Sequence, residues 1–262
     1  MADPHIEGPR LSRDDAFTFR CGADLDCFTH CCRDVSIVLT PYDVLRLKRA
    51  LGLNSSEFLD RYTISPFSKD QKIPAVLLKM EGAGLGCPFV SQSGCSVYSA
   101  RPWACRMYPL GSASPRNPTP QDHEFHFLLK EDLCHGHGQG PVRSVREWLA
   151  HEGIEEYEAM GAGFQSLMLH EFWDKAEPLT PPQMDMFHMA CYDLDRFRRF
   201  VFESRFLKMF DIDEARVEAL RTDDEELLEF GTQWLRFSLF HERTMKIRPE
   251  VIEARRKAEA RA

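Results

Sequence analysis

The sequence lacks any long apolar segment. Nowhere in its 262 residues does a run approach the roughly 18 uncharged apolar residues that a membrane-spanning helix needs. Residues 1–15 also lack the apolar core of a secretory signal. These absences predict a soluble protein with no membrane span that resides in the cytoplasm.

Basic residues are in the minority. The chain has 33 lysine and arginine residues against 41 aspartate and glutamate residues, a formal net charge of -8. Affinity for nucleic acid comes mainly from lysine and arginine neutralising phosphates, so we expect no nucleic-acid partner. A glycine-rich turn of the G-x-G-x-x-G type is also missing, because residues 82–86 are too short and in the wrong context for one.

Cysteine is nearly absent from one half of the chain and abundant in the other. Only Cys191 lies in the second half, on an apolar helical stripe where it is expected to be a buried core residue. This asymmetry predicts a metal-binding domain over residues 17–140 and a helical region over residues 141–262. The other eight cysteines are Cys21, Cys27, Cys31, Cys32, Cys87, Cys95, Cys105 and Cys134.

Three explanations of the clustered cysteines compete: a disulfide framework, a redox nucleophile with spare thiols, or a metal site. A chain of this size does not need disulfides to fold, and the cytoplasm keeps thiols reduced. Clustering therefore favours metal, and eight cysteines supply two sets of the four thiolates that zinc and iron–sulfur clusters commonly use. Alternative metal ligands are His30, His135 and His137.

The adjacent Cys31 and Cys32 raise a separate question. Neighbouring Cα atoms are only about 3.8 Å apart, so the two side chains point in different directions unless the turn is sharp. Either the two cysteines serve two metal centres, or one is a ligand while the other packs or reacts.

Local patterns predict short elements followed by longer helices. Thr40, Pro41 and Gly52 are the start and stop signals of a helix between them, and a second helix is expected at 56–62. Predicted strands cover 73–80, 96–98 and 124–129, and residues 112–121 are expected to form a surface loop. The remaining helices are predicted at 145–151, 154–173, 181–201, 214–221, 224–243 and 249–262. Glycines at 82, 84, 86 and 94 supply tight turns beside Cys87 and Cys95.

Three arginines lie close in sequence to the cysteines. Four thiolates around Zn²⁺, or around a cluster core of charge 2+, leave a net charge of -2, which guanidinium groups would offset while donating hydrogen bonds to sulfur. The candidates are Arg33, Arg101 and Arg106.

Several motifs in this order resemble the cysteine-cluster family usually called YkgJ, over roughly residues 17–140. The resemblance is carried by Phe19–Cys21, Cys31–Arg33, Leu39–Thr40, Asp43, Cys87–Phe89, Gly94–Tyr98, Arg101–Pro102, Cys105–Arg106, Tyr108–Pro109 and the cysteine-glycine segment 134–140. It implies a zinc- or iron-chelating domain related to flagellin lysine methylases that are thought to carry a cluster. The chain departs from the family's C-x2-C-x2-C-C signature, because five residues separate Cys21 from Cys27 and three separate Cys27 from Cys31.

Together these patterns predict an α+β, mostly α protein: a small irregular metal-centred domain with short strands, followed by a helical bundle. We expect the eight clustered cysteines to be the ligands of an iron–sulfur cluster, with 4Fe–4S favoured and zinc as the alternative. A cluster with an open position would support a protein-modifying enzyme that acts on a protein substrate. A closed zinc site would indicate a structural or interaction module with a protein partner. No residue spacing indicates a catalytic group.

Overall fold

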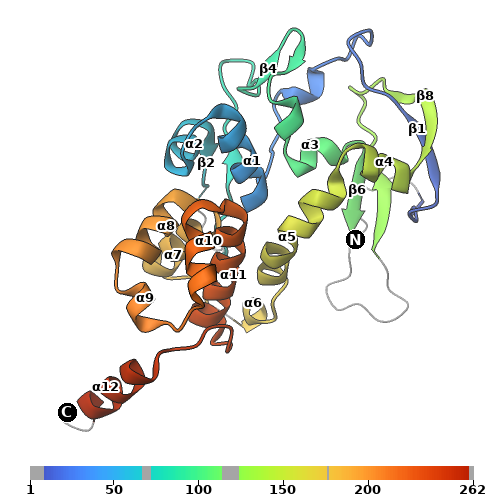
Figure 1. The fold of residues 1–262 in the computed structure, drawn as a ribbon. Coiled ribbons are helices and arrows are strands. Elements are labelled where there is room, and N and C mark those ends of the chain that lie inside the picture. The colour runs from blue at the N-terminus through green and yellow to red at the C-terminus, as the bar shows by residue number, and fades with distance from the viewer. Residues whose placement is uncertain (1–8, 67–71, 114–123, 176, 260–262) are drawn as a thin grey trace.

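The computed structural model describes residues 9–66, 72–113, 124–175 and 177–259. It has the predicted mixed α+β architecture, with an irregular cysteine-bearing region followed by a mainly helical one. Figure 1 shows the short strands and loops gathered at one end of the molecule and most of the helices at the other. The α+β prediction is therefore confirmed.

The described strands form small antiparallel pairs rather than one large sheet. Ala16–Phe19 (β1) pairs with His137–Ser144 (β8), and Leu110–Ala113 (β6) with Phe125–Leu128 (β7). The two shortest pairs are Thr63–Ile64 (β2) with Leu77–Leu78 (β3), and Val90–Ser91 (β4) with Gly94–Cys95 (β5). Because each pair is so small, the sheets alone cannot hold the cysteine region together.

Helices of the cysteine region begin and end largely where the sequence signals predict. Thr40 and Asp43 form a reciprocal capping box at the start of Pro41–Leu51 (α1), and Gly52 ends it with a φ of 66°. A second capping box, made by Asn54 and Glu57, begins Ser55–Tyr62 (α2). The other helical segments of this region are His30–Cys32 (η1), Tyr98–Ala100 (η2) and Trp103–Met107 (α3).

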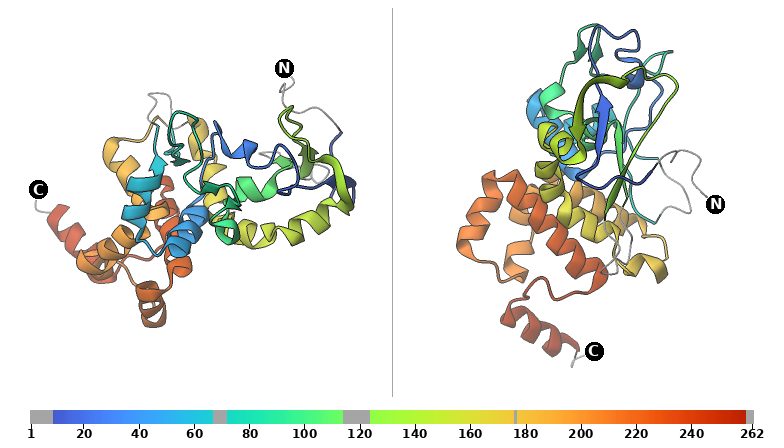
Figure 2. Two further views of the ribbon diagram at one scale, coloured as in Figure 1. Left: turned by 90° about the horizontal axis from the view of Figure 1, so that it is seen from above. Right: turned by 90° about the vertical axis from the view of Figure 1, so that its right-hand side faces the viewer.

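The rest of the described chain is almost entirely helical. Ser144 caps the first of these helices, as predicted. The helices are Val145–His151 (α4), Ile154–Met168 (α5), Phe172–Lys175 (α6), Pro181–Cys191 (α7), Leu194–Glu203 (α8), Phe206–Met209 (α9), Glu214–Thr222 (α10), Asp224–Phe240 (α11) and Pro249–Glu259 (α12). Figures 1 and 2 show α12 at the opposite end of the molecule from β1 and β8.

Four sequence predictions of local structure need correction. The helix expected over 154–173 ends at Met168, and α6 follows it as a separate helix. The expected single helix over 181–201 is broken between α7 and α8, because the Asp193 carboxylate accepts a hydrogen bond from Arg196 N and so caps a new helix. The predicted strand at 96–98 is absent: pairing ends at Cys95, and Tyr98 begins η2. The strand predicted over 73–80 is confined to β3, and most of the loop predicted at 112–121 lies outside the described residues.

Two hydrophobic cores organise the structure. The larger one combines side chains from α1, α2 and β3 with side chains from α5, α7, α8 and α11. The smaller core lies between β1, α3 and α4, and contains Phe17, Phe19, Met107, Leu110, Val145, Trp148, Leu149 and Ile154. The large core thus takes residues from both sides of position 141, and the two-domain division made there remains a proposal.

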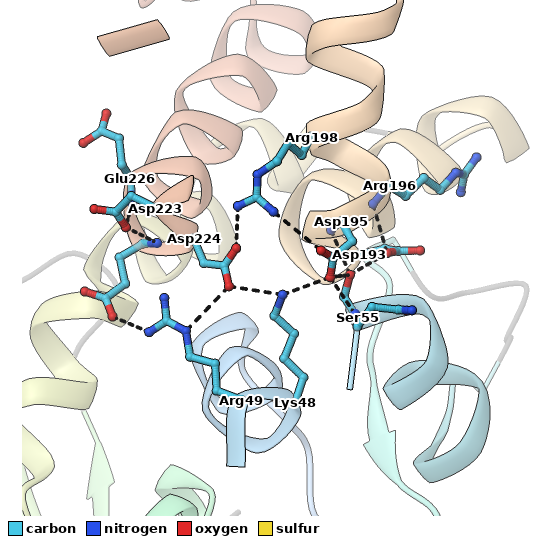
Figure 3. A network of polar contacts seen from close by, with 12 residues as sticks. Lys48, Arg49, Ser55, Asp193, Asp195, Arg196, Arg198, Asp223, Asp224 and Glu226 are labelled. Atoms are coloured by element: carbon cyan, nitrogen blue, oxygen red, sulfur yellow. Dashed lines mark hydrogen bonds and ion pairs between the residues drawn. The ribbon is translucent and has the colours of Figure 1, made fainter. Parts of the chain in front are cut away.

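A charged network joins the first helices to the helical region (Figure 3). The ammonium group of Lys48 on α1 lies 2.9 Å from Asp195 of α8 and 3.1 Å from Asp224 of α11. Ser55, at the start of α2, donates hydrogen bonds to Asp193 and Asp195. These contacts hold α1 and α2 against α8 and α11. None of the helices in the described ranges is long and apolar enough to cross a membrane.

Candidate metal centre

The eight clustered cysteines converge from segments that lie far apart in sequence. A first group assembles where β1 ends, because the Arg20 N–H donates to the carbonyl oxygen of Gly136 at 3.1 Å. A Cβ atom on Gly136 would lie 2.4 Å from the Arg20 oxygen, so only glycine permits this approach. The contact brings the segment that begins at Cys21 beside the segment that contains Cys134.

Cys27 joins the same group through a direct contact with the 134–137 segment. The His135 N–H donates to the Cys27 sulfur at 3.3 Å, and the His135 ring contacts the Asp26 carboxylate at 2.6 Å. Burial and then the thiols of Cys31, Cys27 and Cys134 raise the pKa of Cys21. Cys21 therefore lies near Cys27, Cys31 and Cys134.

A second group forms around the hairpin of β4 and β5. The Cys87 N–H donates to the Cys32 carbonyl oxygen at 2.8 Å, and the Val90 N–H donates to the Cys87 oxygen at 3.1 Å. Val90 is in turn the strand partner of Cys95. Gly94 makes the tight turn at a φ of 109°, in the left-handed region that favours glycine. These contacts place Cys32, Cys87 and Cys95 together.

Cys105 approaches this second group from α3. A buried carboxylate positions that helix, because Asp43 accepts a hydrogen bond from Trp103 N at 2.7 Å. Burial, followed by the neighbouring thiol of Cys87, raises the pKa of Cys105 to about 12. Cys105 thus lies in the same neighbourhood as Cys32 and Cys87.

The adjacent Cys31 and Cys32 lie where the two groups meet. Their thiols hydrogen-bond, which lowers the pKa of Cys31 to about 7 and raises that of Cys32 above its usual value. Cys87 and Cys105 raise the pKa of Cys32 further. The two neighbours thus contact each other but face different partners.

The competing explanations of these thiols are not equally compatible with this arrangement. All nine cysteines are free, so no disulfide framework is present. A reactive thiol needs a lowered pKa, whereas burial raises the pKa of Cys21, Cys87 and Cys105. Cys31 alone among the resolved shifts has a lowered cysteine pKa. Cys191 is fully buried in the large core, away from both groups.

The three candidate arginines occupy different places. Arg101 acts on the thiols, because its charge lowers the pKa of Cys21, Cys31 and Cys105. For Cys21 and Cys105, burial and neighbouring thiols outweigh this effect, so the pKa of each is still raised. Arg106 instead donates to the backbone oxygens of Arg101, Glu152 and Ser99. Arg33 is exposed, with its Nη1 3.5 Å from the position of a Cβ on Gly84.

Two buried polar atoms beside the thiols have no hydrogen-bond partner of normal geometry: Arg101 Nε and the Tyr108 hydroxyl. The other end of the Arg101 guanidinium contacts Glu152 at 2.6 Å. Burial and then the nearby Cys134 thiol raise the pKa of Tyr108. Unused buried donors beside sulfur fit a bound metal centre, whose thiolates and sulfides would accept their hydrogen bonds.

Within the described residues, a histidine and a carboxylate lie close to a cysteine sulfur at the first group. Asp26, Cys27 and His135 have one donor atom each within 4.8 Å of one another. His30 is exposed, and the ring of His137 packs against Phe19 at a centroid distance of 5.3 Å. Neither Asp26 nor Tyr108 was among the predicted site residues. Asp26 nevertheless directly precedes a cysteine, and Tyr108 belongs to one of the motifs that carry the family resemblance.

Sulfur spacing bears on the kind of centre. Across the described residues no other trio of cysteine, histidine or acidic donor atoms lies within 4.8 Å, so no three cysteine sulfurs converge that closely. Thiolates bound to one zinc ion lie about 3.8 Å apart, whereas those around a cubane cluster lie about 6 to 7 Å apart. Within the described residues, no three of these thiols are therefore closed around a single ion.

A polar cavity of about 310 Å³ adjoins α3. Arg106 and Arg46 contribute guanidinium groups, and each lies over the ring of Tyr157 at 4.9 and 5.6 Å. Glu156, His151 and Tyr98 also line it. The mixture of charges and aromatic rings suits a polar side chain rather than an apolar ligand.

These features define a class: a metal-binding cysteine-cluster domain. Residues 20–135 match the family model CxxCxxCC, described as "Putative zinc- or iron-chelating domain". This match is to the same kind of domain as the YkgJ-type resemblance seen in the sequence, which it confirms over these residues. Neither the curated proteins nor the solved structures gave a match to the chain.

Proposed function

We propose that this protein uses the thiolates of its eight clustered cysteines to hold an iron–sulfur cofactor, and that 4Fe–4S is the favoured form of it. The gathering of eight free cysteines from distant segments carries the proposal, because eight thiols supply two sets of the four thiolates that a cluster uses. Thiolates around a cubane stand about 6 to 7 Å apart, so a cluster does not require three sulfurs within 4.8 Å of one another, as a single zinc ion does.

The chain's own residues would hold and tune the cofactor. The cysteines supply the ligands, and their loss of protons would accompany binding because burial favours the protonated thiols. Arg101 Nε and the Tyr108 hydroxyl are free to donate hydrogen bonds to sulfur. A bound cluster would supply electron transfer, or Lewis acidity at an open position.

Protein modification is the enzymatic role that we attach to this proposal. It is supported by the resemblance to flagellin lysine methylases and by the polar cavity beside α3, which suits a side chain of a protein substrate. The alternative is a zinc-binding structural or interaction module without catalysis.

Purification without oxygen tests the cofactor. We expect brown protein with broad visible absorption, and with iron and acid-labile sulfide in equal amounts. Colourless protein with stoichiometric zinc and no sulfide would instead establish the zinc module. A Cys191→Ser variant purified in parallel is the control, because Cys191 lies in the apolar core and should leave the metal content unchanged.

A further inference from the structure

We infer that the eight thiols form two separate four-sulfur centres and that the adjacent Cys31 and Cys32 divide between them. The outer centre consists of Cys21, Cys27, Cys31 and Cys134, and the inner centre consists of Cys32, Cys87, Cys95 and Cys105. The inference rests on the proposed metal-binding function and adds the number of centres and their ligands.

Backbone contacts tie the segments of each set together separately. In the outer centre, hydrogen bonds from Arg20 N to Gly136 O and from His135 N to the Cys27 sulfur tie the 20–27 segment to the 134–136 segment. In the inner centre, the bond from Cys87 N to Cys32 O and the β4–β5 pairing tie Cys32 to the hairpin. The two sets of contacts share no residue.

Cysteines of the two sets also pack against different hydrophobic cores. Cys134 packs against the small core. Cys87 and Cys95 pack against the large core. A single centre would have to draw sulfurs from both cores to one point, which close-packed side chains resist.

Exposure separates the centres further. Cys21 and Cys31 of the outer centre are exposed, while Cys27 is buried and Cys134 partly buried; none of the four inner cysteines is exposed. Asp26 and His135, both exposed, stand beside the outer centre only. The outer centre is therefore the one that reagents and exchanging ligands reach first.

One cation serves both sets. Arg101 interacts electrostatically with Cys21 and Cys31 of the outer centre and with Cys105 of the inner one. Two four-thiolate centres of net charge about -2 each would otherwise repel across the Cys31–Cys32 junction, so the positive charge of the half-buried Arg101 is stabilising to both. Arg101 is a positioning residue and not a ligand.

Stepwise metal release from the unmodified protein tests the division. Metal-loaded protein is treated with increasing chelator under anaerobic conditions, and samples are alkylated and digested to read each cysteine by mass spectrometry. We expect Cys21, Cys27, Cys31 and Cys134 to become alkylated together, before the four inner cysteines. Labelling of all eight in one step, or in sets that mix the two groups, would overturn the inference.

A pair of matched variants gives a second measurement. Cys134→Ser should lose about half of the metal and expose the outer thiols while the inner thiols stay protected, and Cys95→Ser should do the reverse. The helical circular dichroism signal and a Cys191→Ser control show that each variant is folded. Complete loss of metal from either folded variant would indicate one shared centre and contradict the division.

The metal's identity separates this inference from the proposed function. Two zinc ions per chain, lost one at a time from the two sets, would keep the division and overturn the iron–sulfur proposal. A single cluster per chain would keep the iron–sulfur proposal and overturn the division. A protein that binds neither metal would overturn both.

Discussion

The two hydrophobic cores differ fourfold in their number of buried residues, and therefore in how much they stabilise the fold without metal. The large core has 32 buried residues drawn mostly from helices, whereas the small core has eight. Hydrophobic burial supports a fold roughly in proportion to the area removed from water. The comparison indicates that the helical region is stable through its own packing. The cysteine loops depend on thiolate–metal bonds, most of all around Cys134, which packs against the small core, whereas Cys87 and Cys95 pack against the large one.

Removing the metal should produce the largest effect and test this comparison directly. Thiolate–metal binding contributes about 10 kcal/mol or more to the folding of sites of this type. In the metal-free protein we expect amides in residues 21–33 and 86–95 to exchange hydrogen rapidly, while α7 and α11 keep their protection. Equal loss of protection in α11, measured by hydrogen-exchange mass spectrometry, would show that both regions depend on metal.

Replacing single cysteines sharpens the distinction between ligand and core thiols. Cys105→Ser should lower metal content and thermal stability together, because a neutral hydroxyl is a poor ligand for soft metals. Cys191→Ser should keep the metal and cost about 1 to 3 kcal/mol, because it places a hydroxyl in an apolar core. Metal loss from the Cys191 variant with retention in the Cys105 variant would reverse our assignment.

Breaking the charged network of Figure 3 should destabilise the packing of α1 on the helical region without affecting metal. The Lys48 side chain is only 6% exposed and contacts Asp195 and Asp224. Arg198 also contacts both carboxylates, so Lys48→Met removes one of their cations and should cost about 1.5 to 3 kcal/mol. Arg49→Met is the matched control: Arg49 is 43% exposed, and its loss should cost at most about 1 kcal/mol. Equal unfolding free energies for the two variants in urea would contradict the importance of burial.

Local sequence signals predicted the parts of the fold that neighbouring residues determine. Thr40 and Gly52 bound α1 as expected, and Ser144 begins α4, because capping uses groups three or four residues apart. The helix break at Asp193 could not be predicted in the same way. Its carboxylate is also held by Ser55 and Ser56, which are 138 and 137 residues away.

The candidate site shows the same limit. Clustering and the family motifs were enough to select the eight cysteines as candidate ligands and to predict that Cys191 stands apart. How the eight divide depends on long-range contacts such as Cys87 N to Cys32 O, which spacing alone does not reveal. Asp26 and Tyr108 are recognised as site residues only from the folded structure, in which Asp26 contacts His135 and Tyr108 lies beside Cys134.

Acid should weaken the helical region through Asp195. Burial raises the pKa of this carboxyl, but hydrogen bonds from Ser55 and Lys48 outweigh burial and lower its pKa to about 2. A lowered pKa means that the stabilisation is present above about pH 4 and is lost as pH falls toward 2; partial hydration limits it to about 1 to 2 kcal/mol.

The measurement for Asp195 compares urea unfolding of the wild type and of Asp195→Asn from pH 6 to pH 3. Metal release at low pH affects both proteins equally, so their difference isolates this carboxylate. The difference should shrink as the pH falls. A difference that stays constant across that range would show that the ionised form is not the source of the stabilisation.

Removing α12 should have the smallest effect of all, because this helix has no buried residue among those described for it and stands away from both cores. Arg248 anchors the chain just before it by donating to the backbone oxygens of Leu207 and Phe210. A chain ended after Arg248 should therefore keep its metal and unfold within about 0.5 kcal/mol of the full protein. Ending the chain before Arg248 is the control and should cost more, since two carbonyl groups lose their donor. A large loss of stability from the shorter deletion would mean that α12 packs on a core, and the division of the molecule into two cores would need revision.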